Sequence, residues 1–214
     1  ARDGMYYKEF PVMFDWMHTG EGLTSFVLEG LSDPRDNKLI GRTKRFAGFY
    51  MGDDSTAVNY DSQKKLIRSM FNGSRGPMLR KATAVDWAGD PIEVEGRFTP
   101  GHGETNYQQM LDHFKDYNDV AGDHPLNLGT TALSLNAYML SGEERYRDWV
   151  LEYVDAWVER IQNNSGIIPT NIGLDGTIGG ECEGKWYGGV YGWAHSTLDP
   201  ATNQIKHRPS FQIR

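Results

Sequence analysis

Side chains suited to proton transfer occur on several glycine-rich segments, where a backbone can approach a ligand closely. One chemistry that uses such groups is β-elimination next to a sugar carboxylate. The carboxylate must be neutralised by hydrogen-bond donors or a cation, a base removes the neighbouring proton, and an acid protonates the leaving oxygen. The residues that could act as base or acid are His102, His124, Tyr187 and Tyr191.

His124 occurs in the run Gly122-Asp123-His124-Pro125-Leu126-Asn127, just before a predicted helix. In a functional interpretation, His124 is the base or acid, and Asn127, one turn later, binds the carboxylate of a substrate. In a structural interpretation, Asp123 caps the helix and His124 is a solvated loop residue. The residues alone leave both interpretations open.

The segment 184–193 alternates aromatic residues with glycines. Tyr187 or Tyr191 could protonate a leaving oxygen, and the tryptophans offer flat faces to sugar rings. The alternative is an aromatic loop packed against the rim of the fold. The other candidate substrate-binding residues of this segment are Lys185, Trp186 and Trp193.

Further candidates lie outside these two segments. His102 is flanked by glycines, which favours a turn that presents the imidazole, although an ordinary exposed turn has the same composition. Arg75 lies in the tight loop 72–77, where its guanidinium could bind a carboxylate or sulfate, or else bond to loop carbonyls. The remaining candidate substrate-binding residues are Trp16, His18, Asn72 and Asn171, of which Trp16 and His18 could equally belong to the core.

Metal and phosphate sites have weaker signals. Asp53, Asp54 and Asp61 could hold a structural calcium ion, but their spacing matches no calcium loop, so we predict no metal site and no organic cofactor. The sequence of residues 179–185 is close to the motif of a phosphate-binding loop. However, Trp186 replaces the required Ser or Thr, and two Glu residues would repel phosphate.

The elements that must position these residues are predicted to be mainly helical. Apolar residues at steps of three and four continue through 126–163, interrupted at Ser141-Gly142. The short link forces the two helices to run antiparallel, so this range predicts a helix hairpin. Additional helices are expected at 22–31, 37–51 and 105–117.

The segments 52–100 and 166–214 are predicted to be rich in loops. Long loops in compact domains are usually functional or disordered, and the many aromatic residues here favour function. Within the second segment, residues 188–196 and 204–207 flank a turn-forming run and predict a β-hairpin or a protruding loop.

Bulk composition excludes some classes of function. The net charge of −7 argues against nucleic-acid binding, which needs basic patches, but a local cation can still bind an acidic sugar. No stretch approaches the roughly 20 apolar residues of a membrane helix, so no membrane insertion is expected. Cys182 is the single cysteine, which leaves no internal disulfide.

Three segments resemble a group of bacterial carbohydrate-active proteins. They are Gly122–Leu128, Leu140–Tyr146 and, most specifically, Gly184–Trp193. The group comprises (α/α)-toroid polysaccharide lyases and oligosaccharide dehydratases of the ulvan and rhamnose–glucuronate type. The similarity extends from about Phe10 to the end of the chain.

The resemblance implies a periplasmic or secreted bacterial enzyme that acts by β-elimination on an acidic, uronate-containing oligo- or polysaccharide. It also implies one domain over 1–214, built from helix hairpins, long loops and a small β-hairpin. Because a closed toroid needs a longer chain, this domain would be an N-terminal part, completed by the remaining half or by a homo-oligomer. The alternatives are a non-catalytic glycan-binding module or a glycoside hydrolase, whose carboxyl groups could come from Asp86, Asp123, Asp175 and Glu181.

Overall fold

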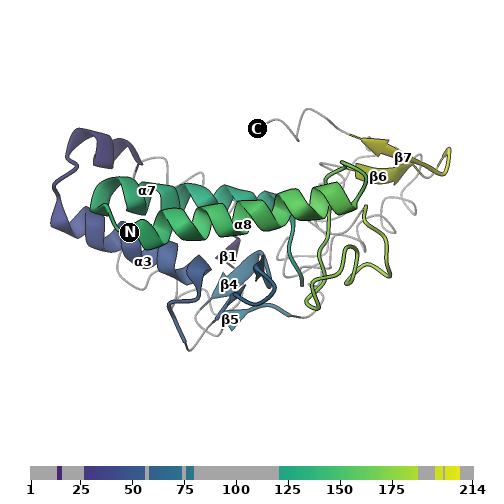
Figure 1. Ribbon diagram of the computed structural model, residues 1–214, viewed down its shortest axis with the longest axis horizontal. Helices are drawn as coiled ribbons and strands as arrows, with labels where there is room; N and C mark the ends of the chain where they lie inside the picture. Colours follow the sequence, from purple (N-terminus) through teal and green to yellow (C-terminus); the bar gives the residue numbers. More distant parts are fainter. Residues whose placement is uncertain are drawn as a thin grey trace, which may run out of the picture.

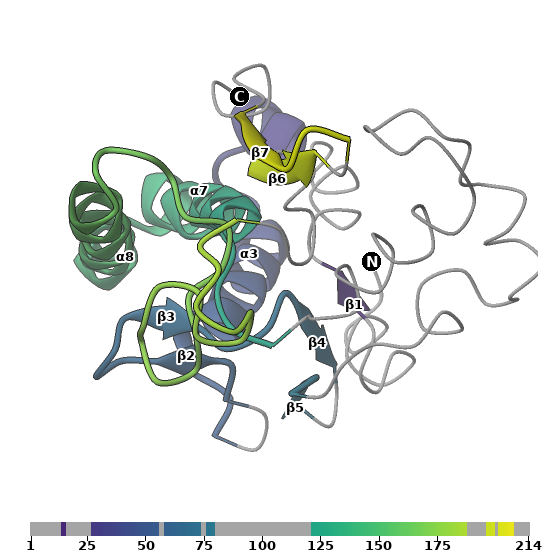
Figure 2. The ribbon, with the colours of Figure 1, turned by 90° about the vertical axis from the view of Figure 1, so that its right-hand side faces the viewer.

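The computed structural model describes residues 14–15, 27–55, 58–73, 76–79, 121–187, 196–199 and 201–207. In these ranges the fold is mainly helical, as predicted. The long helices are α3 (Asn37–Met51), α7 (Thr131–Ser141) and α8 (Glu144–Asn163). Helix α7 packs against both of the others, and Figures 1 and 2 show the three helices side by side.

The predicted helix hairpin is confirmed as α7 and α8. Helix α7 ends at Gly142, which has a left-handed backbone and donates its N–H to the carbonyl oxygen of Tyr138 at 2.8 Å. Helix α8 begins two residues later with Glu144, whose charge suits the positive end of the helix dipole. The range before the hairpin differs from a simple helix, because Pro125–Thr130 forms the 3-10 helix η1.

The expected helix over 37–51 is also confirmed. Asp36 accepts a hydrogen bond from the backbone N–H of Lys38 at 2.8 Å, and Gly52 ends the helix in a left-handed conformation. The helix expected at 22–31 is present over 27–32 of the described residues. The helix expected at 105–117 lies outside the described ranges.

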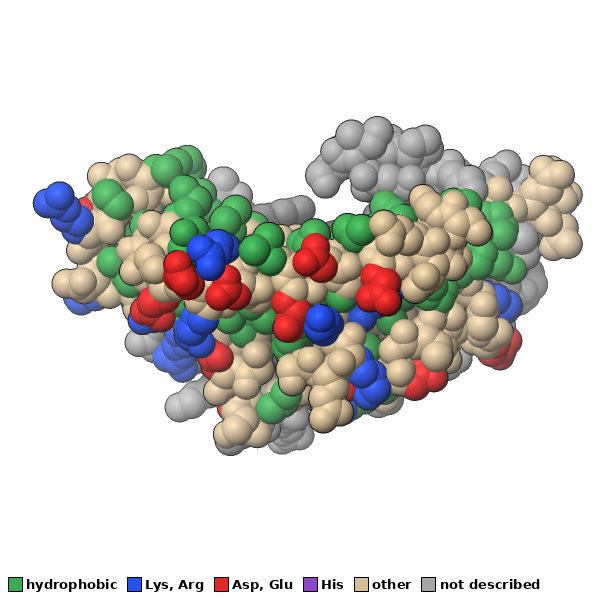
Figure 3. Space-filling model, in the orientation of Figure 1, with side chains coloured by type: hydrophobic (Ala, Val, Ile, Leu, Met, Phe, Trp, Pro, Cys, Tyr) green, Lys and Arg blue, Asp and Glu red, His purple; other side chains and the backbone are tan. Residues whose placement is uncertain are grey.

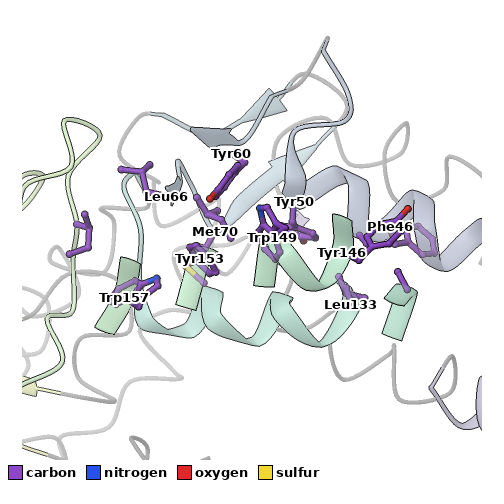
Figure 4. Close-up of a cluster of buried hydrophobic side chains, with 14 of the residues drawn as sticks. Phe46, Tyr50, Tyr60, Leu66, Met70, Leu133, Tyr146, Trp149, Tyr153 and Trp157 are labelled. Carbon is purple, nitrogen blue, oxygen red and sulfur yellow. The ribbon is translucent and has the colours of Figure 1, made fainter. Parts of the chain in front are cut away.

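One face of α8 supplies much of the core. Tyr146, Trp149, Tyr153 and Trp157 are buried, and Figure 4 shows them following one another along the helix. The rings of Trp149 and Tyr153 stack with 5.2 Å between centroids, and Tyr60 meets both edge-on. Burial of each large ring stabilises the fold by roughly 1.5–3 kcal/mol. The opposite face carries mixed charges, visible in Figure 3, from Glu144, Arg147, Asp148, Asp155 and Glu159.

Short strands occur in the described parts of the segments predicted to be loop-rich, although 166–187 consists of turns and isolated bridges. The hairpin expected near residue 200 is confirmed, with Leu198 opposite Ile205 in an antiparallel pair. Two small antiparallel sheets use strands of the earlier segment. One is formed by β2 and β3, and the other has the order β1-β4-β5, in which β1 comes from the start of the chain. The strands are β1 (Phe14–Asp15), β2 (Tyr60–Asp61), β3 (Leu66–Ile67), β4 (Phe71–Gly73), β5 (Gly76–Pro77), β6 (Ser196–Asp199) and β7 (Gln204–His207).

None of the helices in the described ranges combines the length and the apolar composition that crossing a bilayer demands.

Candidate functional site

The fully buried carboxylate of Asp123 connects three parts of the chain. Its Oδ1 accepts hydrogen bonds from the backbone N–H of His124 at 2.9 Å, from Asn127 Nδ2 at 2.8 Å and from the Tyr153 hydroxyl at 2.9 Å. Its Oδ2 accepts from the backbone N–H of Ile67 at 3.1 Å. We call Asp123 and these donors the Asp123 cluster. Because helix α8, η1 and strand β3 each contribute a donor, the cluster holds them in one arrangement.

Arg160 adds a positive charge beside this cluster. Its Nη1 lies 3.8 Å from Asp123 Oδ2, and its Nη2 donates to the carbonyl oxygens of Lys64 and Lys65 at 2.8 and 3.0 Å. The guanidinium therefore holds the β2–β3 turn against helix α8.

The Tyr153 hydroxyl is a donor to Asp123. Burial raises the pKa of Tyr153 well above its ordinary value, so its phenol remains protonated and can donate to Asp123.

Burial raises the pKa of Asp123 from 3.8 to about 6, although the donors Asn127 and Tyr153 and the charge of Arg160 act in the opposite direction. The folded chain therefore holds this proton more tightly than the unfolded chain does. The stability from this group is fully present below about pH 4 and falls as the pH rises towards 6, by about 3 kcal/mol for a shift of this size.

We expect this pH dependence of stability in the wild type but not in Asp123→Asn, because asparagine does not titrate. Urea unfolding of both proteins between about pH 4 and pH 7 measures the difference in their free energies of unfolding. The wild type should lose stability relative to the variant as the pH rises. A difference that is constant over this range would contradict the prediction.

His124 is fully buried, and its ring Nδ1 lies 2.8 Å from the carbonyl oxygen of Thr170. A carbonyl oxygen only accepts, so Nδ1 carries the hydrogen, and the lone pair of a neutral ring is on Nε2. The structural interpretation of the sequence was wrong about this residue. His124 is not solvated, and it stands at the N-cap of η1 in place of Asp123, without a capping bond from its side chain.

Thr170 connects His124 to an aromatic segment much later in the chain. Its backbone N–H and its Oγ1 both donate to the carbonyl oxygen of Trp186, at 2.7 and 3.0 Å. The rings of Trp186 and Tyr187 meet edge-on with 5.5 Å between centroids, and both residues are half-buried. Lys185 is exposed beside them. We call residues 185–187 the aromatic corner, and Thr170 places it next to the segment that carries His124.

The backbone two residues after Thr170 is hydrogen-bonded to the backbone of Asp123. Asp123 and Ile172 form an antiparallel bridge, with N–H to carbonyl distances of 2.7 and 2.8 Å. The cluster, Thr170 and the aromatic corner are therefore parts of one continuous hydrogen-bonded unit.

A model of a domain of unknown function, DUF8034, matches residues 1–197 of the chain. The chain belongs to this family. The matched range includes the Asp123 cluster and the aromatic corner of the DUF8034 chain. No curated protein and no solved structure matched the chain.

Two asparagines predicted to bind substrate, Asn127 and Asn171, are buried and contact protein groups. Asn127 binds a carboxylate, as one interpretation proposed, but that carboxylate belongs to Asp123. Asn171 Oδ1 accepts the backbone N–H of Glu181 at 3.1 Å, and its Nδ2 lies 3.5 Å from the carbonyl oxygen of Ala121. Since both residues are fully buried, their side chains support the loops in this structure.

Of the other predicted site residues, some lie inside the described ranges and the rest lie outside them. Asn72 belongs to strand β4, opposite Phe14 in β1 and Pro77 in β5. Lys185 lies 3.7 Å from Glu183 in an exposed ion pair. The candidates that lie outside the described ranges are Trp16, His18, Arg75, His102, Tyr191 and Trp193.

The described acidic candidates bind other groups of the protein. Asp175 Oδ1 accepts the backbone N–H of Thr177 at 2.9 Å, and Glu181 Oε1 accepts that of Leu174 at 2.8 Å. Of the three residues considered for calcium, Asp53 pairs with Arg145 and Asp61 with Lys64, each at 3.0 Å. Within the described ranges, no group of three or more His, Cys, Asp and Glu residues could hold a metal ion.

Sequence reasoning did not identify Tyr153, Arg160 or Thr170 as parts of the site. A signal existed for Arg160, because it follows Trp157 by three residues and so falls on the buried face of α8. A charged residue on such a face requires a buried partner, which here is Asp123. Thr170 offered no comparable signal, since its role depends on two contacts distant in sequence.

Close backbone packing at Gly122 gives a further prediction for the DUF8034 chain. Gly122 has φ +88, and a Cβ atom would lie 2.4 Å from the carbonyl oxygen of Ile172. We expect Gly122→Ala to lower the free energy of unfolding by more than about 2 kcal/mol, because it adds this clash to left-handed strain. Gly142→Ala, with φ +71 and open space around it, should show only the strain of about 1 kcal/mol. Equal losses in urea unfolding would contradict the argument.

Proposed function

We propose that this chain is a carbohydrate-active enzyme that acts on uronic-acid-containing poly- or oligosaccharide by β-elimination, as a lyase or dehydratase. Its helix hairpin would form part of a larger (α/α) toroid in a periplasmic or secreted bacterial protein. One observation carries the proposal. Thr170 binds both the His124 ring and the Trp186 backbone, so two of the segments that resemble such enzymes are neighbours in space.

The aromatic corner supplies groups that this reaction needs. Trp186 offers a ring face to a sugar, and Lys185 offers a cation to the uronate carboxylate. In the elimination, a base takes the proton from C5, the electron pair of that bond forms the C4–C5 double bond, and the C4–O bond breaks. The Tyr187 hydroxyl gives its proton to the leaving oxygen. The candidates for the base, His102 and Tyr191, lie outside the described ranges.

In this proposal, His124 positions the site and does not remove the proton itself, because its ring is fully buried and bonded to Thr170. Two variants test this role. In His124→Asn, the side-chain amide can replace the Nδ1–H donor without titrating, so we expect kcat within about threefold of the wild type. In His124→Ala, the Thr170 carbonyl loses its donor, and we expect lower activity and lower stability. If His124→Asn folds normally but loses 100-fold or more in kcat, His124 is the base after all.

A hydrolase receives less support from the described residues. Hydrolysis needs two carboxyl groups that face the scissile bond. Asp123 is buried among donors, while Asp175 and Glu181 bind backbone N–H groups of their own loop. Asp86 lies outside the described ranges.

The proposal is tested by incubating the chain with glucuronate–rhamnose and ulvan-type oligosaccharides. β-Elimination creates an unsaturated sugar end that absorbs ultraviolet light, so absorbance should rise with time. The matched control is the same oligosaccharide with its carboxyl groups reduced to alcohols, which should show no rise. Saturated reducing ends would favour a hydrolase. Trp fluorescence quenching by the sugar without any turnover would favour a glycan-binding module.

A further inference from the structure

The carbonyl oxygen of Trp186 is held by two donors from one residue. The backbone N–H of Thr170 lies 2.7 Å from it and Thr170 Oγ1 lies 3.0 Å from it. Thr170 is itself buried, with 1% of its surface exposed, so both donors of these bonds are shielded from water. The peptide group that joins Trp186 to Tyr187 is therefore attached directly to the interior of the protein.

The backbone around Thr170 is itself held by hydrogen bonds. Its carbonyl oxygen accepts from His124 Nδ1, and the nearby Ile172 exchanges two backbone hydrogen bonds with Asp123. The residue that holds the half-buried rings of the aromatic corner is thus connected to a buried charge cluster. Residues whose own positions are locked by such bonds can hold a surface group in one geometry.

We infer that Thr170 is a positioning residue for sugar recognition, and that its hydroxyl orders the Trp186–Tyr187 pair before substrate arrives. This inference rests on the proposed function, because it gives the aromatic corner the role of contacting an acidic sugar. Preorganisation of a stacking surface lowers the entropy lost on binding. Removing one of the two donors should therefore weaken binding even though Trp186 keeps the other.

Three variants isolate the hydroxyl. Thr170→Val keeps the branched shape but removes the donor, whereas Thr170→Ser keeps the donor. Thr130→Val is the matched control, because the buried Thr130 Oγ1 donates to the carbonyl oxygen of Asn127 at 2.7 Å and not to Trp186. Each of the three variants should retain the fold, since each changes one small group.

The first measurement needs no sugar. The indole N–H signal of Trp186 is assigned by NMR with a Trp186→Phe variant, and its relaxation reports the order of the ring. We expect lower order in Thr170→Val and wild-type order in Thr170→Ser and Thr130→Val. If the Trp186 signal in Thr170→Val matches the wild type, the inference is overturned whatever the protein's activity.

The second measurement is the affinity for glucuronate–rhamnose oligosaccharide, measured by calorimetry. Loss of one ordering hydrogen bond should weaken binding about fivefold in Thr170→Val, with recovery in Thr170→Ser. Equal weakening in Thr130→Val would assign the effect to general stability and reject the inference. If the wild type binds or converts no acidic sugar, the proposed function fails, and the relaxation result still decides whether Thr170 orders the corner.

Discussion

Replacing Asp123 with alanine is expected to lower the free energy of unfolding by about 3–5 kcal/mol at neutral pH. The variant leaves the guanidinium of Arg160 buried, with 8% of the residue exposed, after removal of the carboxylate 3.8 Å from it. Breaking one side of a buried pair is strongly destabilising because the remaining charge has no compensation. The buried donors Ile67 N–H, Asn127 Nδ2 and Tyr153 Oη lose the same acceptor.

Urea unfolding followed by circular dichroism measures this loss. Asp155→Ala is the matched control, since Asp155 is an exposed residue of helix α8, and its replacement should change stability by no more than about 0.5 kcal/mol. An Asp123→Ala protein that unfolds within about 1 kcal/mol of the wild type would show that the cluster adds little net stability.

For the proposed uronate β-elimination, replacing Tyr187 with phenylalanine is expected to lower kcat by about 10²–10⁴-fold, the usual effect of losing a general acid or base. The variant keeps the ring and therefore its 5.5 Å edge contact with Trp186. Binding should change little, so KM should remain within about threefold of the wild type. The initial rate of unsaturated product formation over a range of substrate concentrations gives both constants.

Tyr138→Phe controls for loss of a tyrosine hydroxyl elsewhere. Tyr138 is a half-buried residue of helix α7 whose ring lies 5.8 Å from the guanidinium of Arg147, outside the aromatic corner. We expect its kcat to equal that of the wild type. If Tyr187→Phe also keeps the wild-type kcat, another group protonates the leaving oxygen.

The helices could be predicted from sequence because their signals are local. Asp36 and Gly52 mark the ends of α3, and Gly142 separates α7 from α8, all within a few residues of the positions they control. Apolar residues at steps of three and four predicted α8 as a helix, and its aromatic residues lie on the buried face. Such signals depend on the residues of one element and need no knowledge of the rest of the fold.

The environment of His124 could not be predicted in the same way. The surrounding glycine, aspartate and proline are typical of an exposed loop, yet the residue is fully buried. The contacts that bury this segment come from distant residues, since Thr170 is 46 positions from His124 and Ile67 is 56 positions from Asp123. Local composition carries no information about partners at such separations. His124 and Trp186 were both predicted site residues, but the link between them through Thr170 depends on three-dimensional contacts that no local pattern encodes.

The two-residue link between α7 and α8 has a consequence for the order in which contacts form during folding. Closing a short connection loses little chain entropy, so the hairpin can assemble on the microsecond timescale of helices and tight turns. Two partners of Asp123, Tyr153 and Ile67, lie 30 and 56 residues away and must close much longer loops. We therefore expect the α7–α8 hairpin to form first. The contacts of Asp123 and of the segment that carries Trp186 form later.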